Sequence, residues 1–271
     1  SSSPSKPLSP TRVTRRTALA TSLSSRSSPR KRPAASTPKV ETTETPPTTP
    51  KKKQRRSKTE GHAEAESYRH VPDLPDNLAP GLILVFIGAN PGIKSGLAGH
   101  AFSHPTNHFW RRLCLSGITP TVLQPANDVE LPEKYQVGRT DLILRTSRLE
   151  SDIPENERLE AWRVLEEKIR RLKPEAVCVL SKGTWKMMYQ GIYGRQMREQ
   201  DGWEWGWQEG QRIGAEDGWL GSKVWVMPST SGRVTVPRKE VQEGMWRELG
   251  KWVHERRIAR GDVVGGVKEE D

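Results

Sequence analysis

The sequence of 271 residues is poor in cysteine and lacks long apolar runs. Its two cysteines, Cys114 and Cys178, both lie in apolar segments, which argues against a disulfide framework and favours a reducing intracellular compartment. No apolar run approaches the roughly 18 to 20 residues needed to cross a bilayer, so an integral membrane protein is not expected. The sequence as given also has no apolar N-terminal stretch resembling a secretory signal. We therefore expect an intracellular protein without a membrane partner.

Aromatic residues are absent from residues 1–66, although the chain contains 10 Trp. This segment holds 15 Lys or Arg and 5 Glu, together with 23 Ser or Thr and 9 Pro. Its net charge of +10 leaves only +1 of the total +11 for residues 67–271. A segment with so little apolar surface to bury cannot offset the conformational entropy lost on folding. The sequence therefore predicts a disordered basic tail (1–70), one folded domain (71–260) and a short polar tail (261–271).

Within the predicted domain, apolar runs alternate with amphipathic segments. Residues 82–87, 175–180 and 223–227 are runs of the kind that form strands buried on both faces. The segments between them carry helical patterns rather than further strands. The sequence therefore predicts an α/β fold with a mainly parallel central sheet.

Three segments have apolar residues at helical spacing. One spans residues 157–172 and ends before Pro174, another begins near Pro105, and the last spans residues 238–260. The residues expected to face the core are Leu159, Trp162, Leu165, Ile169 and Leu172, then Phe109, Trp110 and Leu113, and finally Val241, Met245, Leu249, Trp252 and Val253.

The loop after the strongest strand has the sequence Gly-Ala-Asn-Pro-Gly-Ile-Lys-Ser (88–95). Loops at the carboxyl ends of strands hold the ligand sites of most α/β folds. A phosphate-binding P-loop would need a second Gly five residues after the first, with Lys directly behind it, and position 93 is Ile. Taken alone, Asn-Pro-Gly is typical of a tight turn.

Three segments together carry a resemblance to a known family. The first is Gly-Ala-Asn-Pro-Gly-Ile-Lys-Ser-Gly-Leu-Ala-Gly-His-Ala-Phe (88–102) with His-Pro-Thr-Asn-His-Phe-Trp (104–110), and it resembles the first motif of the mismatch-specific uracil and thymine DNA glycosylases. Val-Met-Pro-Ser-Thr-Ser-Gly-Arg (226–233) is similar to the second motif of the eukaryotic thymine-DNA glycosylase branch, and residues 138–147 to the middle motif. The resemblance covers about residues 77–250 and implies a three-layer αβα sandwich of the uracil-DNA glycosylase type.

The resemblance implies a monofunctional glycosylase that hydrolyses the N-glycosidic bond of uracil, and of thymine, opposite guanine and leaves an abasic site. Asn90 aligns with the catalytic Asn of the family, whose amide oxygen orients the attacking water without deprotonating it. Ser147 matches a hydroxyl residue that helps to hold this water. An ordinary loop Ser without a catalytic role is an equally good interpretation of this residue. Neither a carboxylate pair nor a cofactor is needed. If a lysine formed a Schiff base, Lys94, which lies beside the expected pocket, would be the candidate.

The family also supplies roles for a base pocket, into which the nucleotide must be flipped. Phe102 aligns with the aromatic residue that stacks on the flipped base, although an isolated Phe is more often a core residue. Ser95 aligns near the wall that faces C5 of the pyrimidine. The main chain from Gly88 through Ala89 to Gly92 would contact the base edge.

Arg233 aligns with the intercalating Arg of the eukaryotic branch, which fills the gap left by the flipped nucleotide from the minor groove. Before it, Ser229, Thr230, Ser231 and Gly232 would offer hydroxyls and main-chain N–H groups to the flanking phosphates. Without the first motif, the simpler interpretation of residues 229–233 would be a Ser/Gly-rich turn that ends a strand.

The sequence departs from the family at three pocket positions. Asp141 stands where the eukaryotic branch has an Asn that hydrogen-bonds the base edge. An ionised Asp would repel the charge growing on the leaving base, so we expect it to be protonated with DNA bound or to point elsewhere. Ala101 replaces a His of the animal enzyme, so recognition of oxidised cytosines does not carry over. Ala89 replaces a larger apolar residue and loosens the pocket.

Two other patterns have simpler interpretations. His100, His104 and His108 recur every four residues, but Pro105 between them favours a helix start over a metal site. Trp203, Trp205 and Trp207 alternate as in a strand inside the Gly-rich segment 200–221. A hairpin with an aromatic face is expected there, with an exposed partner patch as the alternative.

The two tails suggest localisation and modification. The basic runs 29–33 and 51–58 fit nuclear import signals or a cationic arm on DNA phosphates. Five Ser-Pro or Thr-Pro pairs there are candidate phosphorylation sites. Val-Lys-Glu-Glu (267–270) matches the pattern for conjugation of a small ubiquitin-like modifier (SUMO) to Lys268, which would help release the abasic product.

The sequence thus predicts a nuclear, monomeric base-excision-repair enzyme without cofactor or metal, acting on duplex DNA with G·U or G·T mismatches. Its product would pass to downstream abasic-site repair enzymes. A catalytically weak mismatch-binding or scaffold protein in chromatin is the alternative, and a nucleotide-binding α/β enzyme is a third interpretation that the P-loop spacing disfavours.

Overall fold

The structure is a computed structural model that describes residues 70–147 and 153–261. The predictions for the basic tail, its import and phosphorylation signals, and Lys268 lie outside the described residues. No helix in the described part of the chain is long and apolar enough to span a bilayer.

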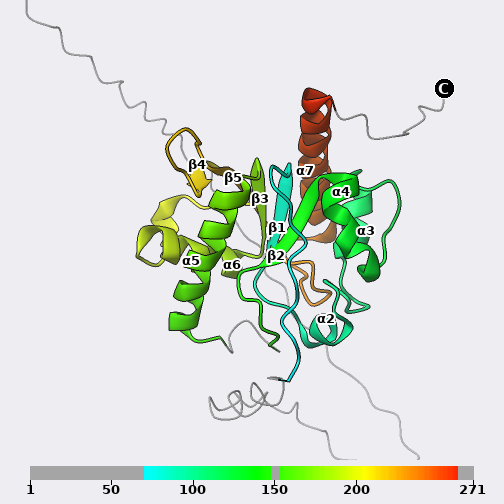
Figure 1. The fold of residues 1–271 in the computed structure, drawn as a ribbon, viewed down its shortest axis with the longest axis horizontal. Coiled ribbons are helices and arrows are strands. Elements are labelled where there is room, and N and C mark those ends of the chain that lie inside the picture. Colours follow the sequence, from blue (N-terminus) through cyan, green and yellow to red (C-terminus); the bar gives the residue numbers. More distant parts are fainter. Residues whose placement is uncertain (1–69, 148–152, 262–271) are drawn as a thin grey trace, which may run out of the picture. The chain divides into compact units, whose positions relative to one another are not determined.

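The fold is built on a five-stranded sheet with the order β2-β1-β3-β5-β4 (Figure 1). Strands β1 (Leu84–Gly88), β2 (Val137–Asp141), β3 (Ala176–Leu180) and β5 (Ser222–Met227) are parallel, and β4 (Gly206–Ile213) is antiparallel to β5. The predicted α/β fold with a mainly parallel sheet is confirmed. Strand β2 was not predicted from hydropathy, because it contains Gly, Arg, Thr and Asp.

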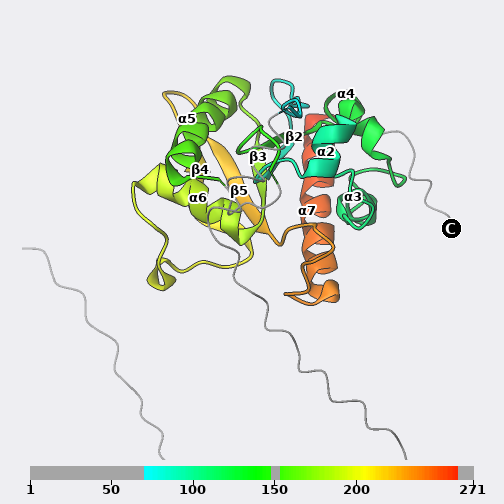
Figure 2. The same cartoon turned by 90° about the horizontal axis from the view of Figure 1, so that it is seen from below.

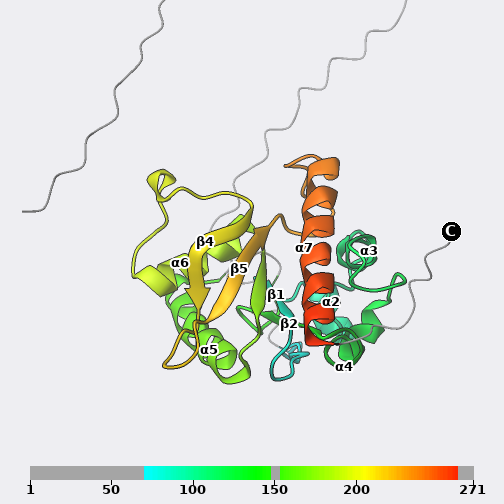
Figure 3. The same cartoon turned by 90° about the horizontal axis from the view of Figure 1, so that it is seen from above.

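Helices cover both faces of the sheet, which confirms the three-layer architecture (Figures 2 and 3). Helices α5 and α6 pack on one face, and α3, α4 and α7 pack on the other. Alternate residues of β1 pack against the two helical layers. Val85 and Ile87 point to α5 and α6, whereas Leu84 and Phe86 point to α3 and α7. The helical elements are α2 (Ile93–Ala98), α3 (Phe109–Leu115), η1 (Pro125–Glu130), α4 (Leu131–Tyr135), α5 (Glu155–Leu172), α6 (Lys182–Tyr193), η3 (Glu199–Asp201) and α7 (Lys239–Arg260).

Three helices differ in detail from the prediction. Helix α5 begins at Glu155 rather than at residue 157, and Leu159, which was expected to face the core, is 37% exposed. Helix α3 begins at Phe109 rather than near Pro105, because residues 104–108 form a turn and the Asn107 side chain accepts a hydrogen bond from the Phe109 N–H.

In α7 the predicted core residues Met245, Leu249 and Val253 are buried, but the stripe differs at its first position. Val241 is 51% exposed, whereas Gln242 is buried and donates its side-chain N–H to the Pro237 carbonyl.

The hairpin expected within residues 200–221 is only half contained there, because β4 pairs with β5, which begins at Ser222, and the aromatic residues are part of the packing. Only Trp207 lies within β4, where its ring makes edge contacts with Trp225 at 5.0 Å and Trp252 at 5.1 Å between centroids. Trp203 and Trp205 precede the strand and pack on each other at 4.6 Å. All three of the predicted residues are partly buried against the two core clusters, so they do not form an exposed patch.

The close approach of α7 to the end of α3 gives a stability test within one helix. A Cβ on Gly250 would lie 1.8 Å from the Ser116 carbonyl oxygen, whereas a Cβ on Gly244 would meet nothing within 4 Å. Gly250→Ala should therefore lower the free energy of unfolding by about 2 kcal/mol or more. Gly244→Ala should raise it by about 0.5 to 1 kcal/mol, because Ala favours the helix. Urea unfolding of both variants measures the contrast, and equal effects would contradict the α3–α7 contact.

Candidate active site

A cavity of about 650 Å³ opens at the carboxyl ends of the parallel strands. Its walls come from the loop after β1, helix α2, the loop before α3, and the segments after β2, β3 and β5. Every residue singled out from the sequence for a site lines this one cavity: Asn90, Ser147, Gly88, Ala89, Gly92, Ser95, Phe102, Asp141, Ser229, Thr230, Ser231, Gly232 and Arg233.

Backbone hydrogen bonds continue the parallel pairing of β1 and β2 beyond the ends of both strands. The N–H of Leu142 donates to the Gly88 carbonyl at 2.9 Å, and the N–H of Ile143 donates to the Ala89 carbonyl at 3.0 Å. Further along, the Ser147 N–H donates to the Pro91 carbonyl at 3.2 Å. These bonds join the two loops and bring Ser147 beside Asn90, although 57 positions separate them.

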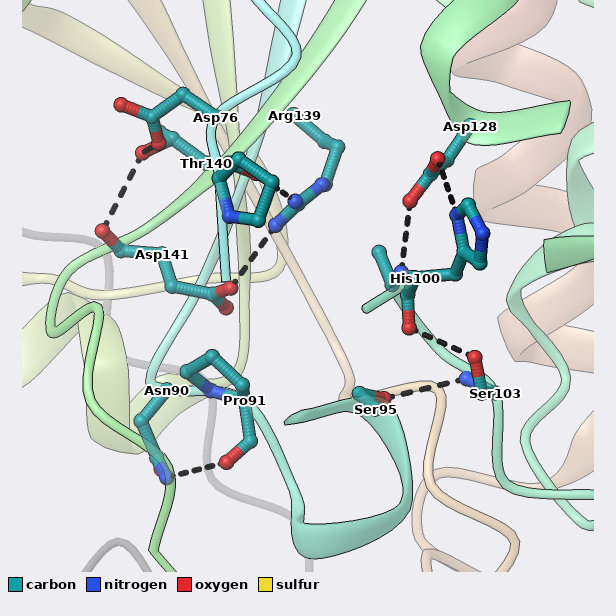
Figure 4. A network of polar contacts seen from close by, with 12 residues as sticks. Asp76, Asn90, Pro91, Ser95, His100, Ser103, Asp128, Arg139, Thr140 and Asp141 are labelled. Carbon is teal, nitrogen blue, oxygen red and sulfur yellow. Dashed lines mark hydrogen bonds and ion pairs between the residues drawn. The ribbon is translucent and has the colours of Figure 1, made fainter. Parts of the chain in front are cut away.

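The side-chain amide of Asn90 is held in one orientation (Figure 4). Its Nδ2 donates to the Pro91 carbonyl at 3.0 Å and to Ser147 Oγ at 2.8 Å, with the Ser147 carbonyl at 3.4 Å. Because carbonyl oxygens only accept, these contacts require nitrogen rather than oxygen at that position. No hydrogen bond to Oδ1 is found among the described residues, so this oxygen remains an acceptor for a molecule in the cavity.

Phe102 combines the two interpretations considered for it. Its ring is half-buried and stacks on Phe109 with centroids 3.9 Å apart, yet it also lines the cavity. Its backbone has a φ of 54°, a conformation rarely adopted by bulky residues. The adjoining main chain is fixed by Ser95, whose Oγ accepts from the Ser103 N–H at 3.2 Å, and by Asp128, whose carboxylate accepts from the Ala101 N–H at 2.8 Å.

Asp141 ends β2 directly opposite Gly88 and belongs to the cavity wall. Its carboxyl oxygen Oδ2 lies 3.2 Å from Nη1 of the buried Arg139, which also donates to the Pro75 carbonyl. The other oxygen occupies the space beside Gly88, where a Cβ would be only 2.2 Å away. Burial raises the pKa of Asp141 to about 6; the positive charge of Arg139 opposes this rise and Asp76 adds to it. Of the two expected alternatives for Asp141, the structure shows a side chain that lines the cavity rather than one that points elsewhere.

Hydrogen bonds account for two of the three regularly spaced histidines. His100 Nδ1 is 3.0 Å from Asp128 Oδ1, and His104 Nδ1 is 2.9 Å from the Thr106 hydroxyl. Within residues 70–147 and 153–261, no group of three or more His, Cys, Asp or Glu is placed to hold a metal ion.

The segment 229–233, called the plug loop below, is anchored at its base and exposed at its tip. The His108 N–H donates to the carbonyl of the buried Thr230 at 2.9 Å. Gly232 passes so close to Thr106 that a Cβ would lie 2.4 Å from the Thr106 carbonyl oxygen. Beyond it, the side chain of Arg233 is exposed at the cavity rim.

The cavity also contains residues that sequence reasoning did not assign. Ser181 follows β3, has a φ of 152°, and accepts the Thr184 N–H at 2.9 Å as the cap of α6. The sequence signal that could have identified Ser181 is its position directly after a predicted strand. The other unassigned wall residues are Leu74, Pro91, Ile93, His104, Thr106, Asn107 and Leu180; Lys94, noted as a nucleophile candidate, also belongs to the wall.

Comparisons with known proteins identify the family of the domain that carries this cavity. The family model of the uracil DNA glycosylase superfamily matches residues 75–250. A G/U mismatch-specific uracil DNA glycosylase from Schizosaccharomyces pombe (strain 972 / ATCC 24843) is 30% identical over 187 residues, which make up 68% of this chain and 54% of the relative. The chain thus spans about half the length of the curated relative that it matches.

Proposed function

Because the chain belongs to the uracil DNA glycosylase superfamily, we propose that it excises uracil from G·U mismatches in duplex DNA, and thymine from G·T mismatches. The observation that carries this proposal is the fixed amide of Asn90, whose Oδ1 is available at the wall of a cavity large enough for a nucleotide base.

The proposed reaction is hydrolysis of the N-glycosidic bond. As this bond breaks, the base leaves with the bonding electrons and the sugar becomes an oxocarbenium-like cation, which needs only a weak nucleophile. Asn90 Oδ1 accepts a hydrogen bond from a water and directs its oxygen toward the sugar carbon. Ser147 Oγ keeps the Asn90 amide in place at 2.8 Å. An amide cannot deprotonate the water, so we expect a slow, monofunctional enzyme that leaves an abasic site.

Base recognition is assigned to the main chain of residues 88–92 and to three side chains. Phe102, supported from behind by Phe109, offers a surface on which a flipped pyrimidine can stack. Asp141 lies at the cavity and, when protonated, can donate a hydrogen bond to a base oxygen. Ser95 is 7% exposed and holds the loop that carries Phe102. Its side chain is small, so this part of the wall leaves room for the methyl group of thymine.

DNA distortion is assigned to the plug loop. Arg233 can fill the space of the flipped nucleotide and contact phosphates with its planar guanidinium group. Its exposure next to the cavity supports this role. We further propose a nuclear location with hand-over to abasic-site repair enzymes, resting on the basic runs of residues 29–33 and 51–58.

A second candidate function is mismatch binding without efficient catalysis. Asp141 favours it, since an ionised carboxylate beside the base would oppose the negative charge that develops on the leaving group. Both functions use the same cavity and plug loop, and they differ in whether a base is released.

The proposal is tested by single-turnover assays on duplexes containing G·U, G·T or A·U and on single-stranded uracil DNA. We expect excision of uracil opposite guanine to be fastest, with slower release of thymine. Intact G·C duplex serves as the unreactive control. Tight binding of the mismatches without release of either base would instead establish the binding function.

A further inference from the structure

A second cavity, of about 420 Å³, lies between α3 and the start of α7. We call it the α3–α7 pocket, and its lining residues are His108, Arg111, Arg112, Leu115, Lys239 and Glu243. Three of these residues are permanently cationic at neutral pH and one is acidic. Apart from the main-chain N–H of His108, which anchors the plug loop, none of these residues was assigned a part in the site described above.

Arg112 is the unusual member of the α3–α7 pocket. Its side chain is buried, with 7% of the residue exposed, and its Nη1 has no hydrogen-bond partner among the described residues. A buried guanidinium nitrogen without a partner is costly and calls for an acceptor. The acceptor must come from outside the described part of the chain, from an ordered water or from a ligand.

The acidic residue of the pocket does not fill this need. Glu243 lies 3.5 Å from Lys239 Nζ and 3.8 Å from Arg247 Nη2, and no ion pair with Arg112 is found in the described ranges. Burial lowers the pKa of Arg112. The negative charge of Glu243 opposes this decrease by electrostatic attraction, without a hydrogen bond. Burial also lowers the pKa of His108, and Arg112, Arg111 and Lys239 lower it further, as expected where positive charge is in excess.

The α3–α7 pocket adjoins the active-site cavity through the chain itself. Asn107 lines the first cavity and the next residue, His108, lines the second. The His108 N–H holds the Thr230 carbonyl of the plug loop, and Lys239 begins α7 a few residues after Arg233. The two cavities therefore meet at residues 107 and 108, and the second lies next to the anchor of the plug loop.

We propose that Arg112, with Arg111 and Lys239, binds a backbone phosphate of the DNA duplex next to the plug loop. A phosphate oxygen supplies the acceptor that Arg112 Nη1 lacks, and guanidinium groups suit phosphate geometry. Such a contact positions the duplex without reading its sequence. This inference rests on DNA being the substrate, as in the proposed function, but it does not require that a base be released.

The test measures the affinity of the full chain for an unmismatched duplex over a range of salt concentrations. Arg112→Met should weaken binding by about tenfold and reduce the slope of log K against log[salt] by about one. Arg111→Gln, at an exposed position of the same pocket, should act in the same direction and guards against a folding defect of the first variant. Arg163→Gln, at an exposed position of α5 on the opposite face of the sheet, removes the same charge and should leave the affinity and slope close to the wild-type values.

A second readout uses inorganic phosphate as the probe. Phosphate should raise the Tm of the wild-type chain above its value in chloride of equal ionic strength, and Arg112→Met should abolish this rise. Wild-type affinity and slope in both Arg111→Gln and Arg112→Met would overturn the proposal. Phosphate stabilisation lost in Arg112→Met with unchanged duplex binding would also overturn it, because the pocket would then hold a free anion. A reduced slope in a protein that releases no base would keep the phosphate site and refute the excision activity.

Discussion

Asn90→Ala is expected to slow single-turnover excision of uracil from a G·U duplex by about 100- to 1,000-fold while duplex affinity changes little. The substitution removes Oδ1, the acceptor proposed to position the water, and leaves the attacking molecule unoriented. The expected loss concerns the chemical step alone, because Asn90 belongs to the cavity wall after β1 and not to the plug loop. Rate and affinity should therefore separate in this variant.

The comparison needs a variant that loses the same amide elsewhere. Asn156→Ala changes an exposed residue in the first turn of α5, on the opposite layer of the fold, and should retain the wild-type rate. Rates are measured with enzyme in excess, and affinities with the same duplex carrying an uncleavable nucleotide. An Asn90→Ala rate within threefold of wild type would remove Asn90 from the mechanism.

The second large effect concerns pH. Because burial raises the pKa of Asp141 to about 6, its carboxyl group is mostly protonated at pH 5 and mostly ionised at pH 7. If the neutral form is the one that assists base departure, the excision rate should fall by up to about tenfold per pH unit above pH 6. Asp141→Asn keeps the shape and a donor at every pH, so its rate should be flat over this range. A wild-type rate that is constant from pH 5.5 to 8 would show that Asp141 does not contact the leaving base.

The same raised pKa makes an independent prediction about stability. The folded chain binds the proton of Asp141 more tightly than the unfolded chain, whose pKa is near the ordinary value of 3.8. The stabilisation from this proton is therefore complete below about pH 4 and is lost as the pH rises to about 6. Relative to Asp141→Asn, the free energy of unfolding of the wild type should decrease by about 3 kcal/mol over that interval and stay level above it.

Only the change with pH matters in this comparison, because the loss of the Arg139 partner shifts the variant by a constant amount. Asp217→Asn, at an exposed turn between β4 and β5, supplies the control for removing one carboxylate and should track the wild type. Urea unfolding at pH 4, 5, 6 and 7 is sufficient. A wild-type curve parallel to that of Asp141→Asn would mean that Asp141 titrates normally.

The sequence predicted the elements whose burial leaves a hydropathy signal. Strands β1, β3 and β5 are continuous apolar runs, and α5 has a regular stripe, so all four were identified. Strand β2 was not, because it buries the polar side chains of Arg139 and Asp141, which contact each other through one hydrogen bond that only the structure reveals.

Helix α6 escaped prediction for a related reason. Gly191 reads as a helix breaker in the sequence, but here it allows contact between α6 and α5: a Cβ would lie 2.2 Å from the Trp162 ring. A glycine required for close packing cannot be distinguished from a turn glycine without the partner helix.

The residues of the candidate site were identified through the resemblance, and the structure gathers all of them in one cavity. Hydropathy alone would have indicated the loops after the predicted strands β1, β3 and β5, without giving their residues a role. The α3–α7 pocket had no sequence signal, since Arg112 and Lys239 are distant in the chain and an Arg in a short helix is ordinarily a surface residue.

Because backbone hydrogen bonds join the loops after β1 and β2, the pocket wall can change during evolution without a change in the position of Asn90. Asn90 is positioned by main-chain atoms and by Ser147, and Ala89 and Ser95 contribute no side-chain bond to its amide. Substitutions at those two positions can reshape the wall against the base without displacing the residue proposed to hold the water. Under the proposed function, a lineage can thus change its preferred base by single steps, each of which retains the position of Asn90.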